Sequence, residues 1–230
     1  MKIAGLTKLT LLDFPEVVAC IVFTAGCNFR CPFCHNASLV TGDLSASIDE
    51  NEVLDFLKRR QGILEGVVVT GGEPLLQGDI ESFLEKIKAL GYKIKLDTNG
   101  TNPSLLKRLV DKGLVDYVAM DIKNSPDGYS LAIGIENFDI AKVEESKNFL
   151  LSGVVPYEFR TTLVKGIHTK DSLKDLARFI SGAKNYYLQQ FKDSGDLISP
   201  NGLSAFSEEE MKEFLEEVSP FVKAVILRGI

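Results

Sequence analysis

The chain lacks the features that mark several large classes of protein. Its 230 residues contain no apolar run close to the roughly 18 that a membrane-spanning helix needs. The first residues form no continuous apolar stretch of the kind found in a secretory leader. Basic residues do not dominate, because 26 Lys and Arg stand against 32 Asp and Glu, for a net charge of −6. We therefore expect a cytoplasmic protein that acts neither within a membrane nor broadly on nucleic-acid phosphates.

Cysteine is scarce, and its distribution is the main clue. Three of the four cysteines, Cys27, Cys31 and Cys34, follow the pattern C-x3-C-x2-C. The fourth, Cys20, lies within an apolar run, and we expect it to be a buried core residue. A disulfide would leave one cysteine of the run over, and a structural zinc site takes four protein ligands. A [4Fe-4S] cluster normally takes four cysteines, so with three it would keep one iron open to a ligand that is not protein.

β-Branched runs alternate with amphipathic segments along most of the chain. Strands are predicted at 17–24, 66–70, 92–96, 115–120, 155–164, 186–191 and 222–227, and helices from 47 or 49 onward and at 80–90, 103–112, 140–151, 171–180 and 207–218. Residues 1–16 are mixed in character, and 11–15 are expected to be a loop or a short extended piece before the first strand. We expect 37–46 to be irregular and the stretch after 123, with Pro126 and two glycines, to be a loop. Ser207 and Glu210 predict a capping box at the start of the last helix. The alternation predicts an α/β fold with a parallel sheet and one domain over 1–230, with a short extension at 1–16 and a last strand at 222–228.

Polar motifs fall at the ends of six successive predicted strands. They are the cysteine run, Gly71-Gly72-Glu73-Pro74, Asp97-Thr98-Asn99-Gly100, Asp121-Ile122-Lys123, Arg160-Thr161-Thr162 and Gln189-Gln190. A site at the switch point of an open sheet would use only two or three neighbouring loops. A site ringed by all six favours a curved sheet, so we expect a partial (β/α)6 barrel similar to a TIM barrel.

Taken together, these motifs resemble a known family. The cysteine run with Phe33 before its last cysteine, followed by GGEP after the next strand, resembles the radical S-adenosylmethionine (SAM) enzymes. DTNG and DIK make the chain similar to the activating proteins of glycyl radical enzymes. The opening Leu12-Asp13-Phe14-Pro15 looks most like the branch that activates anaerobic ribonucleoside-triphosphate reductase. The resemblance extends from about Leu12 to Phe191.

The resemblance implies a cofactor, a reaction and partners. Cys27, Cys31 and Cys34 would hold three irons of a [4Fe-4S] cluster, and the amino and carboxylate groups of SAM would chelate the fourth. The reduced cluster would cleave SAM to methionine and a 5′-deoxyadenosyl radical, with no catalytic residue beyond the cluster and SAM. The radical would take hydrogen from a glycine of a partner glycyl radical enzyme, expected to be the anaerobic ribonucleotide reductase. A flavodoxin- or ferredoxin-type protein would donate the electron.

The resemblance and the strand-end positions also assign residues to SAM. These residues are Phe33, Cys34, His35, Gly71, Gly72, Glu73, Asp97, Asn99, Asp121, Lys123, Arg160, Gln189 and Gln190. The two glycines would let the chain approach the methionine end of SAM because no Cβ intervenes. Glu73 would accept a hydrogen bond from the SAM ammonium, and Phe33 and His35 would lie beside the adenine.

Simpler structural roles are open for some of these residues. Asp121 and Lys123 could form a buried ion pair, and Arg160 could make a local salt bridge. His168, which precedes a helix, is expected to be a solvated loop residue.

Three other functions compete with a reductase activase. Pyruvate formate-lyase activase has a histidine near SAM where this chain reads Tyr187–Phe191 without one, which argues against that assignment. A small-molecule radical SAM enzyme, such as a 7-carboxy-7-deazaguanine synthase, is a second alternative. A non-enzymatic protein, in which a zinc ion or a cluster only stabilises the fold, is a third. The absence of further cysteines leaves no room for a second cluster.

Overall fold

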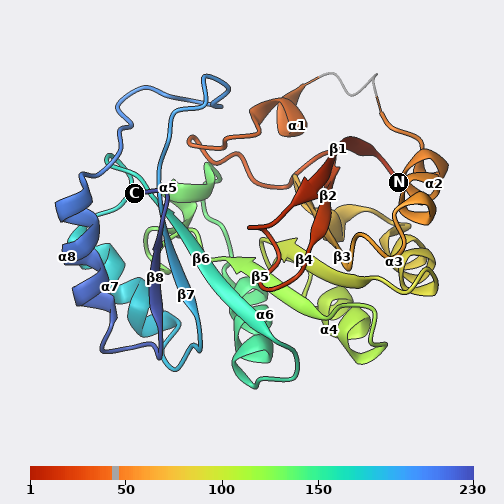
Figure 1. Ribbon diagram of the computed structural model, residues 1–230. Coiled ribbons are helices and arrows are strands. Elements are labelled where there is room, and N and C mark those ends of the chain that lie inside the picture. The colour runs from red at the N-terminus through yellow and green to blue at the C-terminus, as the bar shows by residue number, and fades with distance from the viewer. Residues whose placement is uncertain (43–46) are drawn as a thin grey trace. The chain divides into compact units, whose positions relative to one another are not determined.

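The computed structural model describes residues 1–42 and 47–230 (Figure 1). Its contacts divide the chain into two compact units. The first unit comprises Met1–Asn28, Ser38–Ala119 and Val154–Pro156, and the second comprises Phe29–Ala37, Met120–Gly153 and Tyr157–Ile230. The single domain expected over 1–230 stays a prediction.

The first unit opens with a hairpin and continues with strand–helix pairs. Its elements are β1 (Ile3–Thr10), β2 (Ala19–Thr24), α1 (Ala37–Thr41, shared at Ala37), α2 (Glu50–Arg59), β3 (Gly66–Gly71), the 3-10 turn η1 (Pro74–Leu76), α3 (Ile80–Ala89), β4 (Lys93–Thr98) and α4 (Pro103–Asp111). β1 pairs antiparallel with β2, whereas β2, β3 and β4 pair in parallel. β2 and β3 are buried along nearly their whole length, as expected for parallel strands covered on both faces.

The second unit continues the same alternation. β5 (Tyr117–Asp121) has its last two residues in this unit, and α5 (Tyr129–Ile133), α6 (Ala141–Leu151), β6 (Tyr157–Leu163), α7 (Lys170–Phe179), β7 (Tyr186–Gln190), α8 (Glu208–Val218) and β8 (Val225–Arg228) follow. β6, β7 and β8 pair in parallel. The strand order equals the chain order. Each of the six strands from β2 to β7 is followed by a helix, so the predicted α/β fold with six parallel strand–helix pairs is confirmed within the described residues.

The N-terminal segment contains a strand that was not predicted. Residues 3–10 form strand β1, with register shifts where β1 meets β2, and the loop expected at 11–15 follows it. A bulged strand is stabilised by its partner strand more than by its own pattern of apolar and polar residues, so β1 is hard to predict from the sequence alone. The expectation of an irregular 37–46 was also wrong at its start, since Ala37–Thr41 is helical; residues 43–46 lie outside the described part of the chain. The loop predicted after DIK contains the short helix α5.

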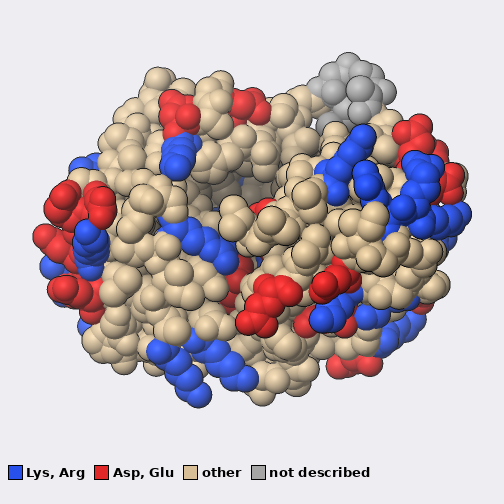
Figure 2. Space-filling model, in the orientation of Figure 1, with Lys and Arg blue, Asp and Glu red and all other residues tan. Residues whose placement is uncertain are grey.

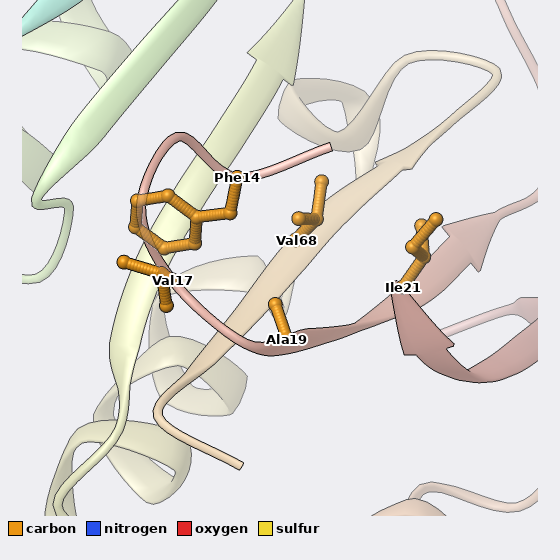
Figure 3. Packing of buried hydrophobic residues seen from close by; sticks show 5 residues of the cluster. All are labelled: Phe14, Val17, Ala19, Ile21 and Val68. Carbon is orange, nitrogen blue, oxygen red and sulfur yellow. The ribbon is translucent and has the colours of Figure 1, made fainter. Parts of the chain in front are cut away.

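The apolar face of the first unit's sheet is covered by the segment that precedes β2. Phe14 and Val17 of this segment pack on Ala19 and Ile21 of β2 and on Val68 of β3 (Figure 3). Gly66 lies beneath them, and a Cβ there would come within 2.7 Å of Val17 Cγ1. Cys20, on the opposite face, is fully buried, and burial raises its pKa to about 12. The prediction that Cys20 is a core residue is confirmed.

Charged side chains of both signs are interspersed on much of the face in Figure 2. Acidic side chains gather over α8, at the left edge of the view. The helix carries Glu208, Glu209, Glu210, Glu213, Glu216 and Glu217, and the predicted capping box at its start is present, with Ser207 bonded to Glu210. None of the helices in the described ranges has the length and apolar character that crossing a bilayer requires.

Phe14→Ala tests whether the segment before β2 is part of the core. Phe14 is 3% exposed, so the loss of its ring should lower the free energy of unfolding by about 3–5 kcal/mol. Leu12→Ala is the matched control, because Leu12 lies in the same segment but is 85% exposed and should change stability by less than about 0.5 kcal/mol. Urea unfolding would measure both, and equal effects would contradict the packing described above.

Candidate functional site

The predicted site residues divide between the two units. Cys27 and the GGEP and DTNG motifs belong to the first unit. Cys31, Cys34 and the DIK, Arg160 and Gln189–Gln190 positions belong to the second. Each unit's part of the site has its own hydrogen-bond network.

In the first unit, the two glycines of GGEP serve the chain's own close packing. A Cβ on Gly71 would come within 2.2 Å of the Thr24 carbonyl oxygen, and one on Gly72 within 2.0 Å of the Gly26 carbonyl oxygen. Gly72 N–H also donates to Thr24 C=O at 2.9 Å. The space that the missing side chains leave is therefore filled by the backbone that leads into Cys27. This packing is a second reason for glycine at both positions, and their close approach to SAM stays a prediction.

Glu73 is the centre of the first unit's network. Its carboxylate is fully buried and accepts from Leu75 N at 3.0 Å, Thr98 Oγ1 at 2.8 Å and Asn99 N at 2.6 Å. Its own N–H donates to Gly26 C=O at 2.9 Å. A buried carboxylate needs such donors because desolvation of the charge is otherwise costly. Glu73 thus ties GGEP to the start of the cysteine run and to DTNG.

Asn99 carries this network to a cysteine. Its Nδ2 donates to Asn28 Oδ1 at 2.8 Å and lies 3.9 Å from Cys27 Sγ, within reach of a weak N–H···S hydrogen bond. Its Oδ1 accepts from Thr101 N at 3.0 Å and from Thr101 Oγ1 at 2.7 Å, which fixes the orientation of the amide. Thr101 Oγ1 accepts from Asn28 Nδ2 at 2.9 Å, so the ring of contacts is closed. Asn99 therefore presents a donor to the sulfur of Cys27.

Asp97 has a buried partner that the sequence reasoning missed. Lys95 Nζ is 2.7 Å from Asp97 Oδ1, and the Lys95 side chain is only 1% exposed. Both residues lie on β4 two positions apart, so they share one face of the strand. The available signal was a lysine between Ile94 and Leu96, two apolar residues of the strand, because a buried charge is rarely left unpaired.

In the second unit, the other two cysteines are joined by a tight turn. Cys34 N–H donates to Cys31 C=O at 3.0 Å across Pro32 and Phe33. Proline suits the second position of such a turn because its φ is already fixed. The Phe33 ring is buried, with its centre 6.2 Å from that of His168, and the His35 ring lies 5.6 Å from Phe191. Burial lowers the pKa of His35, and the positive charge of Lys123 lowers it further.

The three charged residues of the second unit come together. Asp121 Oδ2 is 2.9 Å from Lys123 Nζ, and Asp121 Oδ1 is 2.9 Å from Arg160 Nε. Burial acts to raise the pKa of Asp121, but the two cations outweigh it and hold that pKa well below its usual range. Burial acts to lower the pKa of Lys123, but attraction to Asp121 and to a Cys31 thiolate raises it. All three side chains therefore stay charged at neutral pH. The ion pair anticipated as an alternative is present, and their contact with SAM stays a prediction.

His168 is not the solvated loop residue that the sequence suggested. It is 4% exposed, its Nδ1 accepts from Val164 N at 3.1 Å, and its Nε2 is 2.8 Å from Lys123 C=O. These partners require the neutral tautomer with hydrogen on Nε2. The sequence placed a polar residue after a strand and gave no sign that the loop folds inward onto Lys123. His168 holds the backbone of the DIK segment.

Gln189 and Gln190 are the last two residues of strand β7, and their side chains lie on opposite faces of that strand. Gln189 pairs with Thr162 of β6. Thr162 lies two residues after Arg160, so Gln189 is on the same face of the sheet as Arg160. Gln190 points the other way, and its Nε2 donates to Phe206 C=O at 2.8 Å. Side chains of consecutive strand residues alternate, so only one of the two can face Asp121 and Arg160. That one is Gln189.

The cysteines and their surroundings fit an iron–sulfur cluster. None of the four cysteines forms a disulfide. Cys27 has an amide donor, and Cys31 has the ammonium group of Lys123 in electrostatic reach, both of which favour a thiolate. Among the described residues, no three His, Cys, Asp or Glu side chains converge on a point where a single ion would bind. A cluster does not require such convergence, because each thiolate binds a different iron.

Comparison with known proteins agrees with this chemistry. Residues 21–180 match the family model of the Radical SAM superfamily. The chain is 30% identical over 241 residues to a proposed glycyl-radical enzyme activating enzyme of Methanocaldococcus jannaschii, covering 99% of this chain and 96% of that protein. It is 33% identical over 144 residues to the 7-carboxy-7-deazaguanine synthase of Koribacter versatilis, covering 62% of this chain and 60% of that protein.

A solved structure supports the fold. The chain is similar to Streptococcus suis SuiB bound to S-adenosylmethionine, with a TM-score of 0.70 and 12% identity, over 89% of this chain and 48% of that one. At this identity the likeness shows the fold alone.

Asn99→Ala tests the donor to Cys27. Loss of a residue that orients a metal ligand typically costs roughly 10–100-fold in metal affinity or activity, and we expect a loss of that size in cluster retention against a chelator. Asn102→Ala is the control: it removes the N-cap of α4, which accepts from Leu105 N, and should cost about 1 kcal/mol of stability without loosening the cluster. Equal cluster loss in both variants would show that the effect is general destabilisation.

The burial of His168 predicts a pH dependence of stability. Burial lowers its pKa, so its neutral form stabilises the protein above the unfolded-state pKa of about 6.5, and this stabilisation is lost as the pH falls. Between pH 7 and 5 we expect the free energy of unfolding to decrease by up to about 1.4 kcal/mol per pH unit for this residue. Urea unfolding across that range should show a smaller slope in His168→Gln. In His35→Gln, the control, the free energy of unfolding should still decrease with falling pH by the amount that His168 contributes. If the decrease in His168→Gln equals that of the wild type, His168 is not its source.

Proposed function

Since the chain belongs to the Radical SAM superfamily, we propose that it is an activating enzyme that forms a glycyl radical on a partner protein. The observation that carries this proposal is the similarity to the proposed activating enzyme of M. jannaschii, which extends over 99% of this chain. When bound and reduced by one electron, the [4Fe-4S] cluster would break the C5′–S bond of SAM and so supply a 5′-deoxyadenosyl radical, with methionine as the other product. In the proposed reaction a Cα–H bond of a glycine breaks, the hydrogen atom passes to this radical, and 5′-deoxyadenosine and a glycyl radical result.

The chain's own residues would bind and orient the reactants. We propose Cys27, Cys31 and Cys34 as the cluster ligands, supported by the Asn99 amide beside Cys27 and by the positive charge of Lys123 near Cys31. Several polar residues of the two units are proposed to contact SAM. They are Phe33, His35, Gly71, Gly72, Glu73, Asp97, Asn99, Asp121, Lys123, Arg160 and Gln189. Gln190 is left out of this set because its amide is bonded to Phe206 on the far face of β7.

The pairing of charges in these residues supports binding of a zwitterion. The methionine end of SAM carries one ammonium and one carboxylate group. In the second unit, the Asp121 carboxylate lies between two cations, Lys123 and Arg160. The ammonium group of Lys123 has three N–H donors, so it can donate to a ligand as well as to Asp121. In the first unit Asp97 supplies a carboxylate that Lys95 holds in place. Fixed partners of both signs orient such a ligand without rearrangement during the reaction.

The proposed partner is a glycyl radical enzyme, and anaerobic ribonucleoside-triphosphate reductase is the first that we would test. A flavodoxin- or ferredoxin-type protein is the proposed electron donor. The cytoplasm is the proposed compartment, because reduced thiols persist there and remain available to iron.

A small-molecule reaction is the second candidate. The observation in its favour is the match to a 7-carboxy-7-deazaguanine synthase, at 33% identity over 62% of this chain. The match to the activating enzyme extends over nearly the whole chain, which is why we rank the activase first. Radical SAM enzymes share their cofactor chemistry across different substrates, so the substrate must be tested directly.

Anaerobic reconstitution with iron, sulfide, reductant and SAM tests the reaction class. We expect 5′-deoxyadenosine to form, and Cys31→Ala to abolish it together with the cluster absorbance. Cys20→Ala is the matched control, because Cys20 is a buried core thiol outside the run and its loss should leave product formation within about twofold. An intact cluster that yields no 5′-deoxyadenosine would contradict the class.

The partner is tested by adding anaerobic ribonucleotide reductase to the active mixture. A glycyl radical EPR signal, with transfer of deuterium from α-deuterated glycine into 5′-deoxyadenosine, would support the activase. Deuterium transfer from a small molecule and none from the protein would favour the second candidate.

A further inference from the structure

Tyr129 has the one buried side-chain polar atom without a hydrogen-bond partner among the described residues. The residue begins helix α5 in the second unit and is 1% exposed. Its hydroxyl oxygen is buried and makes no hydrogen bond of normal geometry. The backbone N–H of Lys123 lies close enough to the oxygen to lower its pKa, but an N–H is a donor and leaves the hydroxyl hydrogen without an acceptor. A buried donor without an acceptor costs about 1–3 kcal/mol, so an orphaned hydroxyl needs an explanation. No local pattern predicted this feature, because the residue lies in a segment expected to be a loop.

The ring of Tyr129 is held firmly. It stacks on Phe138 with 5.7 Å between ring centres and 16° between planes, and Phe29 meets it edge-on at 6.4 Å. Phe29 also contacts Phe138 edge-on at 5.4 Å, so the three rings form a closed aromatic cluster. The hydroxyl is thus fixed by packing that phenylalanine would reproduce.

Tyr129 is also tied to the cysteine run. Arg30 N–H donates to Ile133 C=O, the last residue of α5, at 2.8 Å. Gly134, which ends the helix with φ 65°, approaches so closely that a Cβ there would lie 2.3 Å from Arg30 C=O. Helix α5 is therefore docked on the backbone directly before Cys31.

The charges around the hydroxyl point to an anionic acceptor. Burial raises the pKa of Tyr129, which keeps the hydroxyl protonated and able to donate. Lys123, Cys31 and Asp121 all lie within its electrostatic reach. Asp121 accepts from Lys123 and Arg160, and no hydrogen bond joins Tyr129 to Cys31. The acceptor that the Tyr129 hydroxyl lacks would therefore be supplied by a group bound to Cys31.

We propose that the Tyr129 hydroxyl donates a hydrogen bond to a sulfur of the [4Fe-4S] cluster at the iron held by Cys31. Tyr129 is then a positioning residue that stabilises the loaded site and tunes the cluster. Hydrogen bonds to cluster sulfurs stabilise the reduced state and raise the reduction potential. The inference rests on the cluster and is independent of which substrate the radical attacks.

Tyr129→Phe removes only the hydroxyl. In the cluster-free protein the variant should be as stable as the wild type or more stable, because an unpaired buried donor is lost. In the cluster-loaded protein the effect should reverse: a chelator should strip iron roughly 10-fold faster or more, and the midpoint potential should shift to more negative values. Urea unfolding, iron release and EPR-monitored redox titration, all without SAM and substrate, give these readouts.

Tyr186→Phe is the matched control. Tyr186 is equally buried in the same unit, but its hydroxyl donates to Thr161 Oγ1 at 2.8 Å. This variant should lose stability in the cluster-free protein and leave the midpoint potential unchanged.

Two results would overturn the proposal. If Tyr129→Phe destabilises the cluster-free protein as Tyr186→Phe does, the hydroxyl has a partner within the chain. If the variant changes neither iron release nor potential until SAM is added, the acceptor belongs to SAM and not to the cluster. Failure of the glycyl-radical reaction would not affect either measurement.

Discussion

The buried carboxylate of Glu73 is the interaction on which the first unit's part of the site depends. It accepts from the turn that follows GGEP and from both Thr98 and Asn99, while its own N–H holds Gly26. A carboxylate in this position cannot be removed without leaving several buried donors unpaired. The absence of side chains on Gly71 and Gly72 lets β3 end close enough to Gly26 for these bonds to form. Asn99, placed by Glu73, then meets Cys27.

The second unit fixes its charges by a different device. Lys123 is held at both ends, since Asp121 binds its ammonium group and His168 binds its carbonyl oxygen. Asp121 is held in turn by Arg160. A charged group kept in place by neighbours cannot collapse onto a wrong partner, and it requires little reorganisation when a ligand arrives. The neutral His168 ring makes this arrangement sensitive to acid, which links the geometry of the site to the stability of the unit.

These networks explain cofactor chemistry better than they explain substrate choice. Thiolates with nearby donors suit an iron–sulfur cluster, and charged groups fixed in pairs suit the proposed binding of SAM, whichever substrate the radical attacks. The residues that distinguish a glycine of a protein from a small molecule need not be among them, since fold and cofactor are shared by enzymes with different substrates. The proposal of an activase therefore rests on similarity over nearly the whole chain.

Local sequence determined much about this protein. The alternation of strands and helices and the capping box at Ser207 are properties of neighbouring residues, and both were predicted correctly. The cysteine spacing is also local, and the family that it indicated is the one whose model matches residues 21–180. Tertiary structure decided what depends on distant partners: strand β1 needs β2, the burial of His168 needs Lys123, and the roles of Gly71 and Gly72 need the backbone at Thr24 and Gly26. It also separated Gln189 from Gln190 and left the Tyr129 hydroxyl unpaired. Spacing along a chain specifies which groups are available, but burial and hydrogen bonding are set by residues far away in sequence, so only the folded chain shows them.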